Sequence, residues 1–125
     1  MKKIVLIDDD PQIVRLLEDH LTALGYSVTT AADGESGFAL VCELKPALVI
    51  TDLMMPVAHG FDVCHRIHTD PALAGTRVLV ISAKHFEIDK RTALRIGADK
   101  YLVKPFPLEE LSRAVAELIG PAGEA

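Results

Sequence analysis

Short apolar stretches recur along this chain and alternate with segments in which apolar residues are spaced every three or four positions. The short stretches predict five strands, at residues 3–7, 27–31, 47–51, 77–81 and 100–104. Four of them are nearly continuous apolar runs, as expected for strands covered on both faces, whereas SVTTA at 27–31 carries small polar residues that suit an edge position. This alternation predicts βαβ units around a parallel sheet.

The helix predicted between the first two strands has clear start and stop signals. Asp10 is placed to cap it, Pro11 occupies its first position, and Gly25 follows its end. We expect its inward face to comprise Ile13, Leu16, Leu17, His20, Leu21 and Leu24. By similar criteria, further helices are predicted at 34–44, 60–68, 86–96 and 107–119.

The length and composition are those of one globular domain. With 125 residues, of which 50% are hydrophobic and 25% are charged, the chain is long enough to bury a core of its own. We predict a single folded domain over residues 1–120, followed by a C-terminal tail or the stub of a linker at 121–125.

Charge and cysteine content argue against several classes of function. The formal net charge is −5 and the basic residues are scattered, so we expect no direct nucleic-acid binding by this chain. Cys42 and Cys64 lie in predicted helices without a CxxC spacing, which favours buried free thiols. The apolar run near the N-terminus is too short for a signal peptide or a membrane span, so we predict no membrane association and a cytoplasmic location.

Polar residues stand where the predicted strands end. In a parallel sheet with right-handed crossovers all strands end at one edge, and ligands bind at that edge where the strand order reverses. The residues expected there are Asp8 and Asp9 after the first strand, Asp52 after the third, Ser82 after the fourth and Lys104 at the end of the fifth. The sequence therefore predicts one polar site assembled from separate segments.

Three carboxylates in one such site would repel one another. A pair of them about 5 Å apart costs roughly 3 kcal/mol at an effective dielectric constant near 20, so the acids either raise their pKa values or bind a cation. Mg²⁺ suits the site because it prefers oxygen ligands and combines one or two carboxylates with a substrate phosphate. Lys104 adds a positive charge for that phosphate, and the Ser82 hydroxyl and the Ala83 amide add hydrogen-bond donors.

Four segments carry a family resemblance: VLIDDDP, LVITDLMMP, VLVISAK and GADKYLVKPF. In this order and spacing they resemble the response-regulator receiver domain, the phosphoacceptor module of two-component signalling, over essentially the whole chain. The resemblance implies an α/β fold with a doubly wound, five-stranded parallel sheet in the order 2-1-3-4-5, which is the flavodoxin-like (βα)5 receiver fold.

The resemblance also assigns the reactive group and the metal. It implies that Asp52 accepts a phosphoryl group from a sensor histidine kinase, a phosphotransfer protein or a small phosphodonor. Asp9 is implied to bind Mg²⁺ or Mn²⁺ directly and Asp8 mainly through a bound water, with Asp52 and the backbone carbonyl of Met54 as the other ligands. The chain would promote only its own phosphorylation and dephosphorylation, as a signalling module and not as an enzyme.

The remaining roles concern the phosphate and the switch. Lys104 and the backbone amide of Ala83 are implied to bind the phosphate, Ser82 to act as the switch hydroxyl, and Tyr101 to turn inward as the aromatic switch. These residues would change the partner-binding surface, which would contact a downstream output protein or a C-terminal output domain. The resemblance also favours a cis peptide bond between Lys104 and Pro105.

Two long side chains bear on the lifetime of the phosphorylated state. Met54 and Lys84 lie two residues beyond Asp52 and Ser82, at positions that border the path of the hydrolytic water. We hypothesise that they obstruct this water and make self-dephosphorylation slow.

Three other functions are weighed against this interpretation. Asp8-x-Asp10 after a strand is similar to haloacid-dehalogenase-like aspartyl phosphatases, but Gln12 stands where that family has Thr or Val. A binding-only receiver that is never phosphorylated generally lacks some site residues, and none is missing here. A flavodoxin-like cofactor carrier needs a hydroxyl-rich or glycine-rich loop after the first strand, where acids stand instead.

Overall fold

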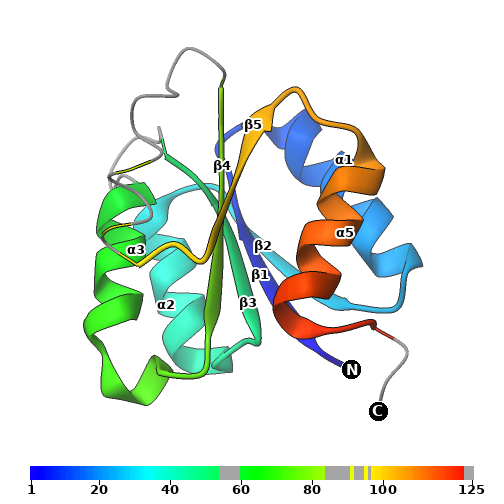
Figure 1. Cartoon of the computed structure of the whole chain (residues 1–125). Coiled ribbons are helices and arrows are strands. Elements are labelled where there is room, and N and C mark those ends of the chain that lie inside the picture. Colours follow the sequence, from blue (N-terminus) through cyan, green and yellow to red (C-terminus); the bar gives the residue numbers. More distant parts are fainter. Residues whose placement is uncertain (54–59, 84–90, 92–94, 96, 123–125) are drawn as a thin grey trace.

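A five-stranded parallel sheet forms the centre of the computed structural model, which describes residues 1–53, 60–83, 91, 95 and 97–122 (Figure 1). The strand order β2-β1-β3-β4-β5 confirms the predicted doubly wound sheet and the edge position of the SVTTA strand. The strands are β1 (Lys3–Ile7), β2 (Ser27–Ala31), β3 (Leu48–Asp52), β4 (Arg77–Ala83) and β5 (Lys100–Lys104).

Helices cover both faces of the sheet, with α1 and α5 on one face and α2 and α3 on the other (Figure 1). Their bounds are α1 (Pro11–Ala23), α2 (Gly34–Leu44), α3 (Gly60–Thr69) and α5 (Leu108–Ile119), and a short 3-10 helix, η1 (Pro71–Leu73), precedes β4. The helix predicted at 86–96 falls mostly on residues outside the described ranges. Among the described helices, none is long and apolar enough to span a bilayer.

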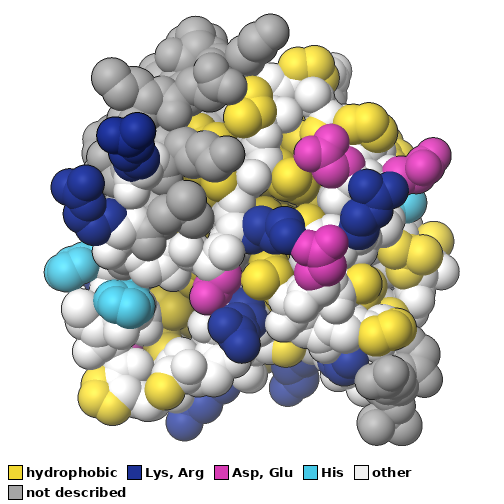
Figure 2. Space-filling view, viewed as in Figure 1, with side chains coloured by type: hydrophobic (Ala, Val, Ile, Leu, Met, Phe, Trp, Pro, Cys, Tyr) yellow, Lys and Arg dark blue, Asp and Glu magenta, His cyan; other side chains and the backbone are white. Residues whose placement is uncertain are grey.

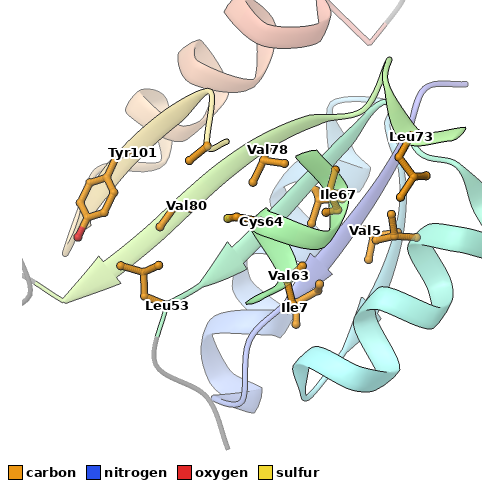
Figure 3. Packing of buried hydrophobic residues seen from close by; sticks show 13 residues of the cluster. Val5, Ile7, Leu53, Val63, Cys64, Ile67, Leu73, Val78, Val80 and Tyr101 are labelled. Carbon is orange, nitrogen blue, oxygen red and sulfur yellow. The ribbon is translucent and has the colours of Figure 1, made fainter. Parts of the chain in front are cut away.

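Alternate residues of the strands point to opposite faces and build two hydrophobic clusters. Val5 and Ile7 face α2 and α3, whereas Ile4 and Leu6 face α1 and α5, and all four are 0% exposed. Figure 3 shows the first cluster, in which Cys64 of α3 lies among the strand residues. Burying an aliphatic side chain contributes roughly 1.5–3 kcal/mol, so these central positions hold the layers together.

The first helix begins as the sequence predicts, but its buried face is narrower than the predicted inward face. The Asp10 side chain accepts a hydrogen bond from the amide of Gln12, and Pro11 is the first helical residue. Leu17 and Leu21 are buried, whereas Leu16 and Leu24, which we expected to face inward, are 50% and 46% exposed. Successive helical residues turn by about 100°, so when Leu17 faces the sheet Leu16 faces away from it.

The two cysteines differ in their surroundings. Cys64 is buried as expected, and its burial, together with the negative charge of Asp99, raises the pKa of its thiol to about 12. The expectation of a buried thiol is wrong for Cys42, which is exposed. Val41 of α2 takes the inward position at 0% exposure, so the next residue along the helix points to solvent.

Two strands end later than their apolar runs. β3 includes Asp52, and β4 continues past the predicted end at residue 81 to Ala83. Asp52 pairs with Ile81, and Ser82 and Ala83 pair with residues of β5. A ladder needs only backbone donors and acceptors, so a polar side chain that ends an apolar run does not end a strand.

The residues after α5 stay in contact with the rest of the domain. The Tyr26 hydroxyl donates a hydrogen bond to the carbonyl oxygen of Gly120 at 2.9 Å, and Lys2 Nζ donates to that of Pro121 at 3.0 Å. Ala122 packs against the cluster that faces α1 and α5. The first two residues of the predicted tail therefore contact the folded body, and its last three lie outside the described residues.

Gly37 allows α2 to approach β1 closely, and we expect its replacement by alanine to destabilise the domain. A Cβ atom at this position would lie 2.4 Å from Cδ1 and 2.6 Å from Cγ1 of Ile7, a stiff and fully buried side chain. Overpacking costs about 1–3 kcal/mol, and the higher helix propensity of alanine offsets part of that cost. We predict a net loss of about 1–2 kcal/mol in the free energy of unfolding, measured in urea.

Gly75→Ala is the matched control, because a Cβ atom at that glycine would have no heavy atom within 4 Å. Equal urea unfolding midpoints for Gly37→Ala and Gly75→Ala would show that α2 can move away from Ile7 without strain.

Candidate functional site

Three carboxylates meet at the carboxyl edge of the sheet. Asp8 and Asp9 follow β1, and Asp52 is the last residue of β3. One carboxylate oxygen from each lies within 4.8 Å of the others. Asp8 is 1% and Asp52 8% exposed, whereas Asp9 faces solvent. The structure thus brings together the three acids that the sequence placed at this edge, and we call them the acidic cluster.

Backbone hydrogen bonds hold Asp8 within the acidic cluster. Its amide donates to the carbonyl oxygen of Ala31 in β2 at 3.2 Å. Its carboxylate oxygen Oδ1 accepts a hydrogen bond from the amide of Asp10 at 3.0 Å. Asp10 in turn caps α1, so the start of the helix fixes the direction of the Asp8 side chain. The role of Asp10 is the one that the sequence predicts.

Lys104 bridges two members of the acidic cluster from β5. Its Nζ lies 3.0 Å from Oδ2 of Asp8 and 3.0 Å from Oδ2 of Asp52. The peptide bond between this lysine and Pro105 is cis, as the resemblance favoured. Among the described residues, one ammonium group contacts this cluster of three carboxylates, which leaves surplus negative charge when all the acids are ionised. A further cation would reduce the remaining repulsion.

The pKa values of Asp8 and Lys104 are both raised, for different reasons. Burial raises the pKa of Asp8, and the charge of Asp52 adds to the rise, although hydrogen bonds from the Asp10 amide and Lys104 oppose it. Burial alone would lower the pKa of Lys104, but its hydrogen bonds to Asp52 and Asp8 and the charges of both outweigh burial and raise it. The site therefore holds its lysine cationic while it disfavours the ionised form of Asp8.

Ser82 lies at the same edge of the sheet as the acidic cluster. It is 0% exposed on β4, one residue beyond the partner of Asp52 in the ladder. Its hydroxyl oxygen is buried and has no hydrogen-bond partner among the residues that the structure describes. Burying a hydroxyl without a partner carries a free-energy cost, so this group is suited to a ligand bound at the acidic cluster.

Of the other predicted site residues, the structure describes Tyr101 and Ala83 but not Met54 and Lys84. Tyr101 of β5 is 8% exposed and belongs to the same hydrophobic cluster as Val80 and Leu53 (Figure 3). Ala83 ends β4 and pairs with Lys104, which brings its backbone to the same edge. The Met54 carbonyl and the Lys84 side chain, expected to bind the metal and to obstruct water, lie outside the described residues.

One buried polar residue next to the site was missed by sequence reasoning. Thr51 precedes Asp52 in β3 and is 0% exposed. In the sequence it is the last residue of the strand predicted at 47–51. The only sign of a functional role for Thr51 in the sequence is a hydroxyl in an otherwise apolar run. Threonine is common in strands for reasons unrelated to function.

Among the described residues, basic side chains form no single patch on the face seen in Figure 2. They are spread over this face among acidic and apolar side chains. The charge distribution on this face is that of a mixed polar surface, whereas nucleic-acid binding typically uses a concentrated basic stripe.

Comparison with protein families places the acidic cluster in a known context. The family model described as the response regulator receiver domain matches residues 4–116. The DNA-binding dual master transcriptional regulator RpaA of Synechocystis is 42% identical over 119 residues, which cover 95% of this chain and 49% of that protein. This chain spans about half the length of the curated relatives that it matches.

Solved structures show the same architecture. A putative response regulator from Chloroflexus aurantiacus superposes with a TM-score of 0.90 at 29% identity, covering 94% of this chain and 97% of that one. The receiver domain of the sensor histidine kinase PA1611 from Pseudomonas aeruginosa superposes with a TM-score of 0.87 at 28% identity, covering 95% and 98% of the two chains. That structure has a magnesium ion coordinated in its active-site cleft.

Proposed function

This chain belongs to the response regulator receiver domain family, and on that premise we propose that it accepts a phosphoryl group on Asp52 in a magnesium-dependent reaction. Receiver domains are signalling modules, and this one has the corresponding fold and an acidic cluster compatible with magnesium and phosphorylation. The observation that carries the proposal is the contact of the Asp52 carboxylate with Lys104 inside a cluster of three acids. A nucleophile, a phosphate-binding cation and metal ligands are thereby joined in one site.

The acidic cluster fits a hard divalent cation. All three side chains offer oxygen atoms, the ligands that Mg²⁺ and Mn²⁺ accept, and their separation of at most 4.8 Å allows one ion to contact them all. We assign Asp8, Asp9 and Asp52 to this ion, with the carbonyl of Met54 as the ligand that the resemblance implies. When bound, the ion neutralises negative charge on the phosphoryl oxygens.

The side chains of this domain perform the transfer by position and charge. A carboxylate oxygen of Asp52 attacks phosphorus in line, and an O–P bond forms as the donor's bond to phosphorus breaks. The leaving group, an imidazole from phosphohistidine or acetate from acetyl phosphate, departs with the electron pair of that bond. Lys104 Nζ, already 3.0 Å from Asp52 Oδ2, is placed to contact an oxygen of the transferred group.

The buried Ser82 hydroxyl acquires a partner in the phosphorylated state. A phosphoryl oxygen on Asp52 would accept a hydrogen bond from the Ser82 hydroxyl, which has no partner among the described residues, and the Ala83 amide would donate another to the same phosphoryl group. Movement of Ser82 and Tyr101 is then the switch that alters the partner-binding surface. These two roles rest on the family resemblance and on the burial of both side chains.

The partners follow from the family and from the length of the relatives. We assign the donor to a sensor histidine kinase or a phosphotransfer protein. We assign the downstream target of the signal to an output protein or an output domain, because curated relatives of about twice this length are named as transcriptional regulators. A cytoplasmic location and a folded unit over residues 1–120 remain part of the proposal, and the two unpaired cysteines accord with a reducing compartment.

Incubation with acetyl phosphate tests the function directly. In Mg²⁺ we expect the intact mass to rise by one phosphoryl group, peptide mapping to place that group on Asp52, and EDTA to prevent the change. A binding-only receiver would show no mass change under any condition. An aspartyl phosphatase would instead turn over p-nitrophenyl phosphate continuously, although the family match gives that alternative no support.

A further inference from the structure

Four polar or charged side chains are buried among the described residues, and all four lie at one edge of the sheet. They are Asp8, Thr51, Asp52 and Ser82. Three of them have a part in the proposed phosphorylation as nucleophile, metal ligand or switch hydroxyl. Thr51 has none, although it is as deeply buried as the others. Its hydroxyl therefore needs an explanation of its own.

Packing does not account for the hydroxyl of Thr51. The residue lies near the carboxyl end of the central strand β3, in register with Ile7 of β1 and Val80 of β4, which are both apolar and 0% exposed. A hydroxyl in such surroundings is unfavourable unless it forms a hydrogen bond. Valine has nearly the same shape and would fill the position without a polar atom.

Among the described residues, the hydroxyl of Thr51 makes one hydrogen bond, to the backbone of the phosphoacceptor. Its Oγ1 donates to the carbonyl oxygen of Asp52 at 3.1 Å. Asp52 is the last residue of β3, so this carbonyl belongs to the peptide with which the chain leaves the sheet. The next residue, Leu53, is itself 0% exposed. The bond thus fixes a peptide plane between the nucleophile and the segment that follows it.

We propose that Thr51 is a positioning residue for the metal site, acting by holding the main chain of Asp52 in the orientation from which the Asp52 carboxylate reaches the acidic cluster. The inference rests on the proposed magnesium-dependent phosphorylation. Groups that orient metal ligands without touching the metal typically change metal affinity by 10- to 100-fold. Loss of this single hydroxyl raises the apparent Mg²⁺ dissociation constant roughly tenfold, at the lower end of that range.

Two substitutions at this position separate the hydroxyl from the methyl group. Thr51→Val keeps the shape and removes the hydrogen bond, whereas Thr51→Ser keeps the hydroxyl and removes a buried methyl group. The measurement is the rise of the thermal unfolding midpoint across a Mg²⁺ titration, with each midpoint in EDTA as the reference. Thr51→Val is expected to bind Mg²⁺ roughly tenfold more weakly. Thr51→Ser is expected to unfold at a lower temperature in EDTA but to bind Mg²⁺ like the unchanged protein.

Thr76→Val is the matched control. The Thr76 hydroxyl donates to the carbonyl oxygen of Pro46 at 2.8 Å, which is the same kind of bond far from the acidic cluster. This variant is expected to shift the midpoint in EDTA and to leave Mg²⁺ affinity unchanged. Equal Mg²⁺ affinity of Thr51→Val and the unchanged protein would overturn the inference. An equal loss in Thr51→Val and Thr51→Ser would overturn it too, because packing would then be responsible.

Two further comparisons keep the test decisive. If Thr51→Val does not fold, the comparison of Thr51→Ser with Thr51→Ala isolates the same hydroxyl. Equal Mg²⁺ affinities of these two variants would count against a positioning role. If the unchanged protein shows no response to Mg²⁺, the proposed function fails, and the inference fails with it. If the unchanged protein responds and Thr51→Val responds equally, only the inference fails.

Discussion

Asp52→Asn is expected to abolish uptake of a phosphoryl group from acetyl phosphate. The substitution keeps the size of the side chain but replaces the carboxylate, the nucleophile of the proposed transfer, with an amide of far lower nucleophilicity. Lys104 retains its contact with Asp8, so the cation stays at the site. We predict that the rate of labelling in Mg²⁺ falls by at least about 100-fold, which corresponds to a barrier higher by about 2.7 kcal/mol, as measured by intact mass over time.

Asp19→Asn provides the control for the change in charge. Asp19 is exposed on α1, and its replacement removes one negative charge without touching the acidic cluster. This variant should be labelled at the rate of the unchanged protein. If Asp52→Asn took up the group at a comparable rate, with the mass mapping to another side chain, the assignment of the phosphoacceptor would be wrong.

Topology explains why the acidic cluster could be predicted from sequence. Lys104 is 96 residues from Asp8 and 52 residues from Asp52, yet its Nζ contacts both carboxylates. No local pattern encodes contacts over such distances. They follow because parallel strands all end at one edge, and the strand order that the family resemblance implied sets which strand ends are neighbours.

Finer features depend on packing that residue patterns do not resolve. The spacing of apolar residues identifies the buried side of α1, but only the packed helix decides that Leu17 and not Leu16 faces the sheet. The same applies to Cys42, exposed beside the buried Val41. The lack of a hydrogen-bond partner for Ser82 among the described residues is likewise a property of the packed structure.

Asp8→Asn is expected to have opposite effects on stability with and without Mg²⁺. Burial raises the pKa of Asp8 in the folded state, so ionising this group costs free energy of folding. In EDTA the contribution of Asp8 to stability should therefore fall as the pH rises from the ordinary value of 3.8 through the raised pKa, and stay reduced above it. The asparagine variant lacks this loss and is expected to be the more stable of the two at pH 7 without metal.

Magnesium should reverse the order of stability of Asp8→Asn and the unchanged protein. At a Mg²⁺ concentration 100 times its dissociation constant, binding adds about 2.7 kcal/mol to the free energy of unfolding of the unchanged protein. Asp8→Asn loses one carboxylate of the acidic cluster and should gain little at the same concentration. Urea denaturation in EDTA and in Mg²⁺ measures both differences, with Asp19→Asn as the control that keeps the full metal response. An Asp8→Asn variant that is less stable in EDTA, or that gains as much from Mg²⁺ as the unchanged protein, would show that the cost of ionising the buried Asp8 carboxylate is not what the ion offsets.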